Sequence, residues 1–251
     1  MKNNQKVIQF LDETLDIHAI QDRSQNGLQV ANSGVIKKIG VAVDASLATF
    51  QAAAAQGVDF LLVHHGLFWG QSENITGPLY HRIKFLIDHD IALYAAHLPL
   101  DLHDTLGNNA QIVQRMGWDD DGPFGLYHGT PIGRAASPNT AVDREALCTG
   151  IGARLEVDPV LWPFGPQEIQ RVAVVSGGGL GQMKEAAEAG FDLLFTGEPS
   201  HASYWPASEL GINVIFGGHY ATEIWGVKAT GELLSERFGF DSVFIDLPTG
   251  H

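Results

Sequence analysis

The sequence predicts an α/β (α+β) fold made of two similar halves, each a mixed β-sheet flanked by helices. Short apolar runs, which are typical of buried strands, alternate along the chain with stretches of helical periodicity. A second observation is that the order of strands, helices and motifs in one half recurs in the other. A third is the composition, since 45% of the 251 residues are hydrophobic and 18% are charged, as in proteins with a large core.

The elements follow one another in a regular order. The chain opens with an amphipathic helix, because Val7, Leu11 and Leu15 recur at helical spacing. A loop with Asn26-Gly27 follows it. Strands are expected at 35–43, 58–64, 91–96, 171–175, 191–196, 212–216 and 242–246. Helices are expected between them at 47–56, 79–89, 105–116, 181–189 and 222–238. Alternation of this kind indicates helices packed on sheets.

The middle of the chain differs from both halves. Residues 118–168 are rich in Gly, Pro and Asp, with one helix expected near 143–154. This composition favours a connector. We therefore predict a first lobe over residues 1–117, a connector over 118–168 and a second lobe over 169–251.

The two lobes share motifs as well as element order. Each has a strand, a helix, a Gly-x-Asp junction and a second strand, with Asp59 in the first lobe and Asp192 in the second. The next strands end on two small residues, a histidine and, four positions later, an acid. The matching segments are Ala95-Ala96-His97 with Asp101, and Gly217-Gly218-His219 with Glu223. We interpret this as a pseudo-twofold repeat in which each half offers a His-x-x-x-acid pair.

Two adjacent histidines end the most apolar strand. The run Phe60-Leu61-Leu62-Val63 leads directly to His64 and His65. In open α/β sheets, ligands bind at the carboxyl ends of the strands. Neighbouring strand residues point to opposite faces, so both imidazoles can serve one centre only where the backbone bends, and Gly66 supplies that freedom.

Six residues at strand ends form a mixed nitrogen and oxygen donor set. They are His64, His65, His97, Asp101, His219 and Glu223. Such a set suits Zn, Fe, Mn, Co or Ni better than Ca or Mg. The competing interpretations are a turn with one surface imidazole for the His-His pair, and hydrogen-bonded or capping pairs for the His-x-x-x-acid motifs.

Three further residues near the strand ends are ambiguous. Glu198 follows a strand and is either a base, a residue that orients a ligand, or a helix-start acid. Asp44 ends a strand, but Val175 stands at the matching position of the other half, so we assign Asp44 to no symmetric site. Trp69 flanks the histidines and either walls a pocket or packs in the core.

Charge and cysteine content narrow the classes of function. The formal net charge of −14, with only 15 Lys and Arg residues, disfavours nucleic acid and anionic membranes as partners. One cysteine, Cys148, allows no disulfide within the chain, which favours a reducing compartment. The N-terminus lacks the apolar core of a signal peptide, and no apolar stretch reaches the length of a membrane span. We therefore expect a cytoplasmic protein.

Several motifs together resemble those of the Nif-three-like family, whose bacterial members are labelled GTP cyclohydrolase 1 type 2 homologs or dinuclear metal-centre hexameric proteins. The resemblance covers nearly the whole chain and fits the short form of the family. The motifs are Asn26-Gly27-Leu28-Gln29-Val30, Val63-His64-His65-Gly66-Leu67-Phe68-Trp69, His97-Leu98-Pro99-Leu100-Asp101, Gly107-Asn108-Asn109, Thr196-Gly197-Glu198 and Gly218-His219-Tyr220-Ala221-Thr222-Glu223.

The resemblance implies two similar α/β lobes, a toroidal homohexamer, and a site for two divalent metal ions between the lobes. By motif match, the metal ligands fall on His64, His65, Asp101, His219 and Glu223. His97 also matches a motif residue near the metals, and we expect it to contact bound water or a ligand rather than the metal itself.

The family label implies that the chain is a metal-dependent hydrolase that adds water at C8 of the GTP purine ring through a metal-bound hydroxide. In that reaction His97 or Glu198 would move protons. One alternative is a two-metal phosphoesterase that acts on a nucleotide or a small phosphorylated metabolite. Another is a non-enzymatic metal-binding hexameric scaffold. The sequence names neither the native metal nor the physiological substrate.

Overall fold

The structure is a computed structural model that describes residues 3–250. Its contacts divide the chain into two units, one containing residues up to Leu100 together with 226–247, and one containing 101–225 with the C-terminal residues. Residues 1, 2 and 251 of the predicted lobes lie outside the described part. The grouping differs from the predicted boundaries, because residues 101–117 belong to the second unit and 226–247 to the first.

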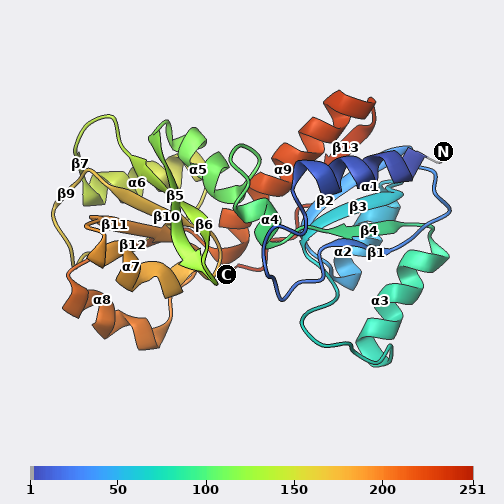
Figure 1. Cartoon of the computed structure of the whole chain (residues 1–251), viewed down its shortest axis with the longest axis horizontal. Helices are drawn as coiled ribbons and strands as arrows, with labels where there is room; N and C mark the ends of the chain where they lie inside the picture. The colour runs from blue at the N-terminus through green and yellow to red at the C-terminus, as the bar shows by residue number, and fades with distance from the viewer. Residues whose placement is uncertain (1–2, 251) are drawn as a thin grey trace. The chain divides into compact units, whose positions relative to one another are not determined.

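The first unit is built on a five-stranded sheet with the order β1-β4-β3-β2-β13 (Figure 1). All neighbouring strands pair in parallel except β1, which is antiparallel to β4. The elements of this unit are α1 (Asn3–Thr14), β1 (Gly27–Val30), β2 (Lys38–Asp44), α2 (Leu47–Ala55), β3 (Phe60–His65), α3 (Gly77–Asp88), β4 (Ala92–Ala95), most of α9 (His219–Phe238) and β13 (Asp241–Phe244).

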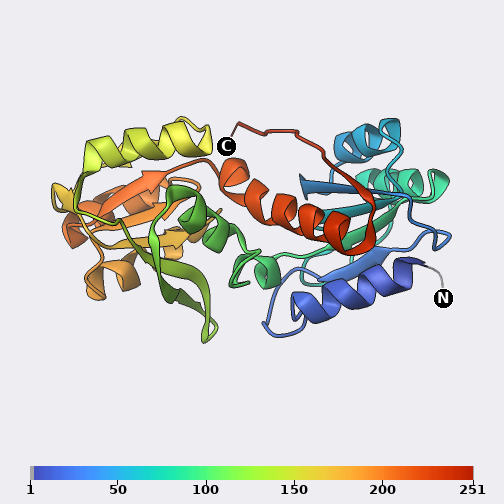
Figure 2. The same cartoon turned by 90° about the horizontal axis from the view of Figure 1, so that it is seen from above.

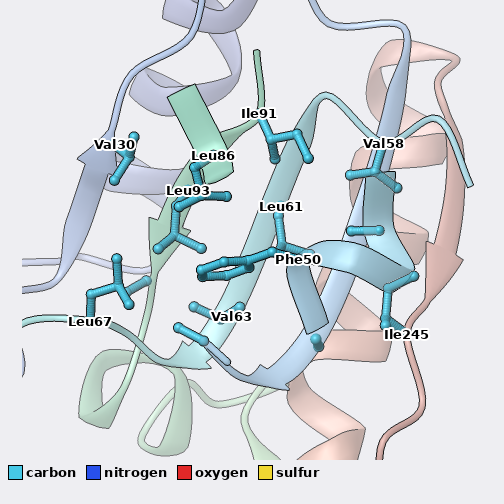
Figure 3. Close-up of a cluster of buried hydrophobic side chains, with 14 of the residues drawn as sticks. Val30, Phe50, Val58, Leu61, Val63, Leu67, Leu86, Ile91, Leu93 and Ile245 are labelled. Atoms are coloured by element: carbon cyan, nitrogen blue, oxygen red, sulfur yellow. The ribbon is translucent and has the colours of Figure 1, made fainter. Parts of the chain in front are cut away.

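Helices cover both faces of this sheet. Phe50 of α2 and Leu86 of α3 pack on one face with Leu61, Val63 and Leu93, as Figure 3 shows. The start of α2 is fixed by Ser46, whose side chain accepts a hydrogen bond from the backbone N–H of Thr49. The other face is covered by α1 and α9: Tyr94 of β4 donates a hydrogen bond to Asp12 of α1, and a Cβ at Gly231 of α9 would contact Val41 of β2.

The second unit is built on a six-stranded sheet with the order β5-β6-β10-β11-β12-β8. Its central strands β10, β11 and β12 are parallel, and β5, β6 and β8 are antiparallel to their neighbours. The elements are α5 (Asn108–Met116), β5 (Asp119–Tyr127), β6 (Thr130–Ser137), β7 (Val142–Asp143), α6 (Arg144–Leu155), β8 (Val160–Trp162), β9 (Glu168–Ile169), β10 (Val172–Val175), η1 (Gly179–Gln182), α7 (Met183–Glu188), β11 (Leu193–Thr196), η2 (His201–Ser203), α8 (Tyr204–Leu210) and β12 (Asn213–Phe216). The short helix α4 (Leu98–Asp101) joins the two units in sequence.

This second sheet is also covered on both faces. Ile112 of α5 and Ile151 of α6 pack against one face, together with Val174 of β10. Met183 of α7 and Ala207 of α8 pack against the other face. In Figure 2 the yellow-green helix α6 and the orange helix α7 accordingly lie on opposite sides of the sheet. The expected class, an α/β fold of mixed sheets flanked by helices, is confirmed.

The region expected to be a connector, residues 118–168, forms regular structure. It contributes β5, β6 and β8 to the second sheet and carries α6. Its acidic and glycine-rich sequence suits β5, an edge strand on which Asp119 and Asp121 are exposed. The part of the chain that the structure describes holds no helix long and apolar enough to cross a membrane.

The internal repeat is visible in individual hydrogen bonds. The Asp59 carboxylate accepts from the backbone N–H groups of Lys37 and Lys38, at the start of β2. The Asp192 carboxylate accepts from the N–H groups of Gln170 and Arg171, just before β10. In each unit the aspartate of the Gly-x-Asp junction, which precedes one parallel strand, therefore binds the backbone at the start of the neighbouring parallel strand.

Candidate metal centre

His64 is the penultimate residue of β3 and has no exposed surface. Its Nδ1 lies 2.9 Å from the carbonyl oxygen of Ala96. A carbonyl oxygen can only accept, so Nδ1 carries a proton, and the neutral form of this ring has its lone pair on Nε2. This is the tautomer in which histidine ligates metals through Nε2.

His65 uses the same arrangement with a carboxylate. Its Nδ1 lies 2.8 Å from Oδ1 of Asp44, the residue that pairs with it in register on β2. Sequence reasoning left Asp44 outside the site, whereas in the structure it orients one of the two adjacent histidines.

Gly66 has a different role from the expected one. It does not adopt a left-handed φ. A Cβ at this position would lie 2.4 Å from Nε2 of Gln29 and 2.6 Å from Cβ of Ala95. The Gln29 Oε1 also accepts the N–H of Leu67 at 2.7 Å. Gly66 is required because Gln29 packs directly on the backbone here, and that packing fixes the chain after the two histidines.

His97 follows β4 and completes a group of three imidazoles in the first unit. One ligand atom each of His64, His65 and His97 lies within 4.8 Å of the others. The ring of His97 is 5.1 Å from that of His64, and Trp69 packs edge-on against it at 4.9 Å. Such a group of nitrogen donors fits a transition-metal ion.

Asp22 holds the ring of His97 from the loop before β1. Its carboxylate oxygens lie 2.9 and 3.1 Å from Nδ1 of His97, so the ring again presents Nε2. Burial favours the neutral acid, but hydrogen bonds from His97 and Asn26, the charge of His97 and the N–H of Ser24 outweigh it and lower the pKa of Asp22 to about 2. Sequence reasoning missed Asp22, because nothing in local spacing connects it with a residue 75 positions away.

His219 begins α9 in the second unit and lies between two carboxylates. Its Nε2 is 3.2 Å from Glu223, one helical turn later, and its Nδ1 is 3.1 Å from Glu198. The hydrogen bond to Glu223 comes first among the causes that raise the pKa of His219 to about 9, with Glu198 adding to it against the effect of burial. A cation held by both His219 and Glu223 would displace the proton that they share.

Glu223 itself is buried against a glycine turn. Its side chain is 5% exposed. A Cβ at Gly177, which has a φ of +58°, would come within 2.0 Å of Oε1 of Glu223. The N–H of Gly177 donates to Oγ1 of Thr222, the neighbour of Glu223 on α9. The turn after β10 therefore leaves room for a buried carboxylate and holds the start of α9 beside it.

Asp101, the last residue of α4, is also buried in the second unit. Its Oδ1 accepts hydrogen bonds from Nδ2 of Asn108 at 2.8 Å and from Oγ of Ser176 at 3.2 Å. Asn109 supports the same corner by donating to the backbone carbonyl of Asp101 and accepting the N–H of Ser176. This accounts for the two asparagines of the Gly107-Asn108-Asn109 motif, which sequence reasoning noted without a role.

The structure thus brings together His64, His65 and His97 in one unit, and His219, Glu223 and Glu198 in the other. In the first group each imidazole has Nδ1 hydrogen-bonded to a protein oxygen, and in the second group an imidazole and a buried carboxylate share a proton. Both groups are suitable ligands for divalent transition metals, because imidazole and carboxylate are common partners of Zn, Mn, Fe, Co and Ni. The residues present therefore fit the expected cofactor.

Comparison with known proteins gives consistent matches over the whole chain. The family model described as Duf34/NIF3 (NGG1p interacting factor 3) matches residues 2–249. A relative from Archaeoglobus fulgidus named GTP cyclohydrolase 1 type 2 homolog is 44% identical over 247 residues, which are 98% of this chain and 99% of the relative. The structure of protein ybgI, described as of unknown function, has a TM-score of 0.93 at 38% identity and 100% coverage of both chains. A structure from Thermus thermophilus has a TM-score of 0.92 at 38% identity and 99% coverage of each chain.

Proposed function

The chain belongs to the Duf34/NIF3 (NGG1p interacting factor 3) family, and from that premise we propose that it is a metal-dependent hydrolase with two divalent ions per subunit. The observation that carries the proposal is the hydrogen bonding of the histidine rings. Each of His64, His65 and His97 has Nδ1 hydrogen-bonded to a protein oxygen, which orients the ring with Nε2 as the ligating atom. His219 has Nδ1 beside Glu198, and its Nε2 faces Glu223, the other proposed ligand on the same helix. Rings oriented in this way are typical of a preorganised metal centre.

The proposed ligands are His64, His65, Asp101, His219 and Glu223. Bound divalent ions supply Lewis-acid chemistry, since they lower the pKa of water and neutralise negative charge that develops on a substrate. The protein contributes rigidity: Asp44 fixes His65, the Ala96 carbonyl fixes His64, and Asn108 with Ser176 fixes Asp101. Ligands held by their neighbours keep their geometry when the metal exchanges.

Two further residues have proposed roles in the reaction. His97 accepts a proton from the attacking water and returns it to the ring nitrogen of the substrate that is released, because one of its own ring nitrogens lies within 4.8 Å of ligand atoms of His64 and His65. The sequence also offers Glu198 as a proton carrier. Its contact with Nδ1 of His219 supports another role, in which it orients that ligand.

The names of the relatives support GTP as the substrate to test first. The proposed reaction is addition of water at C8 of the purine, followed by opening of the imidazole ring. We also propose that the protein acts as a toroidal homohexamer in the cytoplasm, with a small molecule rather than nucleic acid as its partner. Light scattering of the purified protein tests the assembly, and a mass other than six times that of the chain contradicts it.

Metal content is the first test. We expect about two transition-metal equivalents per subunit in gently purified, tag-free protein. Glu223→Gln should lose at least one of them, because a neutral amide is a poor metal ligand. Glu232→Gln is the matched control, since it makes the same change at an exposed position of the same helix. Content near zero that does not rise on reconstitution would overturn the dinuclear centre.

A nucleotide panel then separates the candidate activities. The metal-loaded protein is incubated with purine nucleotides, and loss of the C8 proton is followed by NMR beside phosphate release. Loss of the C8 proton from GTP supports ring opening. Release of phosphate without ring opening supports a phosphoesterase instead. Bound metals without turnover of any nucleotide favour the non-enzymatic scaffold.

A further inference from the structure

Asp22 is an unusually well-bound carboxylate for a residue in a loop. Its side chain is 3% exposed. Besides His97, it accepts hydrogen bonds from the N–H of Ser24 at 3.0 Å, from Nδ2 of Asn26 at 2.9 Å and from the N–H of Leu98 at 3.1 Å. A carboxylate with four partners has a fixed position and a fixed charge.

The same loop also holds the backbone of His97. Oδ1 of Asn26 accepts the N–H of His97 at 2.9 Å, while the other end of that amide binds Asp22. Trp69 closes a further side of the ring, and its own indole N–H donates to the carbonyl of Gly66 at 3.0 Å. His97 is therefore held at its main chain, at Nδ1 and across its ring edge. Nε2 is the ring nitrogen that remains to accept a proton.

We propose that Asp22 is a positioning residue that locks His97 as the Nδ1–H tautomer, with the Nε2 lone pair directed to a water molecule beside His64 and His65. This inference rests on the proposed hydrolase function. The oxygen of that water forms the new bond to the substrate carbon, and its proton passes to Nε2 of His97. The same proton then goes to the ring nitrogen whose bond to that carbon breaks, so His97 ends as it began. The second proton of the water stays on the new hydroxyl and moves to the other ring nitrogen as the C=O bond of the formamide forms.

The Asp22 carboxylate stabilises the imidazolium that forms between these two steps and does not itself take the proton. The arrangement has the logic of the aspartate in a Ser-His-Asp triad, in which the acid fixes the tautomer of the base. Glu198 differs from Asp22 in its exposure and in the role of its partner. Its side chain is 48% exposed, and its partner His219 is a proposed metal ligand.

The test combines an isotope-labelled spectrum with kinetics on zinc-loaded protein. Long-range proton–nitrogen correlations in ¹⁵N-histidine-labelled protein report the tautomer of each ring, and His97→Gln identifies the signals of His97. We expect Nδ1–H in the wild type and a change to Nε2–H in Asp22→Asn, with the zinc content unchanged. Asp12→Asn is the matched control, since it makes the same change in the same unit at a carboxylate that accepts from the Tyr94 hydroxyl.

In Asp22→Asn, kcat for GTP should fall by about 10²- to 10⁴-fold with KM nearly unchanged, as when the aspartate of a Ser-His-Asp triad is replaced. Asp22→Glu should recover part of that loss. An Nε2–H tautomer in the wild type overturns the inference even where Asp22→Asn fails to fold. Unchanged kcat in a variant with an altered tautomer overturns it as well. Absence of GTP turnover in the wild type counts against the proposed substrate, and the spectrum still decides the role of Asp22.

Discussion

Metal binding by this protein should be strongly dependent on pH, because the proton on His219 competes with the metal. Hydrogen bonds to Glu223 and Glu198 raise the pKa of His219 to about 9 in the metal-free chain. At pH 7 only roughly one molecule in a hundred then has an unprotonated Nε2, so the apparent affinity of the metal that His219 binds is about 100-fold below its limit. This corresponds to about 3 kcal/mol of binding free energy.

The assay is a titration of metal-free protein with Co²⁺ against a competing chelator between pH 7.5 and 8.5. We expect the affinity to rise about eightfold over that unit of pH, with His219 releasing close to one proton for each ion bound at pH 7.5 and about 0.8 at pH 8.5. A histidine of ordinary pKa, about 6.5, is already deprotonated in this range and gives an almost flat profile. Calorimetry in two buffers with different ionisation enthalpies measures the released protons directly.

Glu198→Gln isolates the contribution of His219. The variant removes one of the two carboxylates that raise the pKa of His219, so proton release should move to lower pH. Glu188→Gln, an exposed change on α7, is the control. An affinity that changes less than about twofold between pH 7.5 and 8.5 in the wild type would refute the reasoning.

Three further predictions concern stability. Gly177→Ala should lower the free energy of unfolding by about 1–2 kcal/mol and reduce the metal content, because the new Cβ forces Glu223 aside and the residue has a positive φ. Gly178→Ala should have neither effect, because Gly178 has a φ of −79° and its Cβ would lie 3.8 Å from Glu198. The folded-state pKa of His219, about 9, lies above its unfolded value, so its contribution to stability is complete below pH 6.5 and lost as pH rises through 9. The melting temperature of metal-free protein should therefore fall over that window, and His219→Gln should flatten the fall. Gly66→Ala should cost about 1–3 kcal/mol in urea unfolding, since its Cβ would overlap three neighbouring atoms.

Local patterns predicted the elements that carry the candidate ligands. The apolar run before His64 was expected as a strand over 58–64 and is β3, Phe60–His65. The helix expected at 222–238 begins earlier, at His219, and so includes both members of the His-x-x-x-Glu motif. These predictions succeed because buried strands and long helices have strong sequence periodicity.

The features that the sequence did not predict have a common physical cause. They depend on contacts between segments far apart in the chain, and such contacts leave no pattern in the local sequence. Asp44 orients His65 because two parallel strands pair in that register. Asp22 reaches His97 because a loop far away in sequence folds against the end of β4. The hairpin of β5 and β6 was missed because an acidic, glycine-rich edge strand has the composition of a loop.

The internal repeat predicts where functional groups lie but not which partners they have. With the two Gly-x-Asp junctions superimposed, Glu198 stands at the position of His65. With the segments Ala95-Ala96-His97 and Gly217-Gly218-His219 superimposed, His219 stands at the position of His97. In the second unit, Glu198 therefore supplies from within the repeat the carboxylate that fixes His219. In the first unit that position is taken by an imidazole, so His97 needs a carboxylate from elsewhere, and Asp22 provides it from the loop that precedes β1. The repeated scaffold gives both histidines the same place at a strand end, and the different origin of their acceptors agrees with the different roles proposed for them, a metal ligand for His219 and a base for His97.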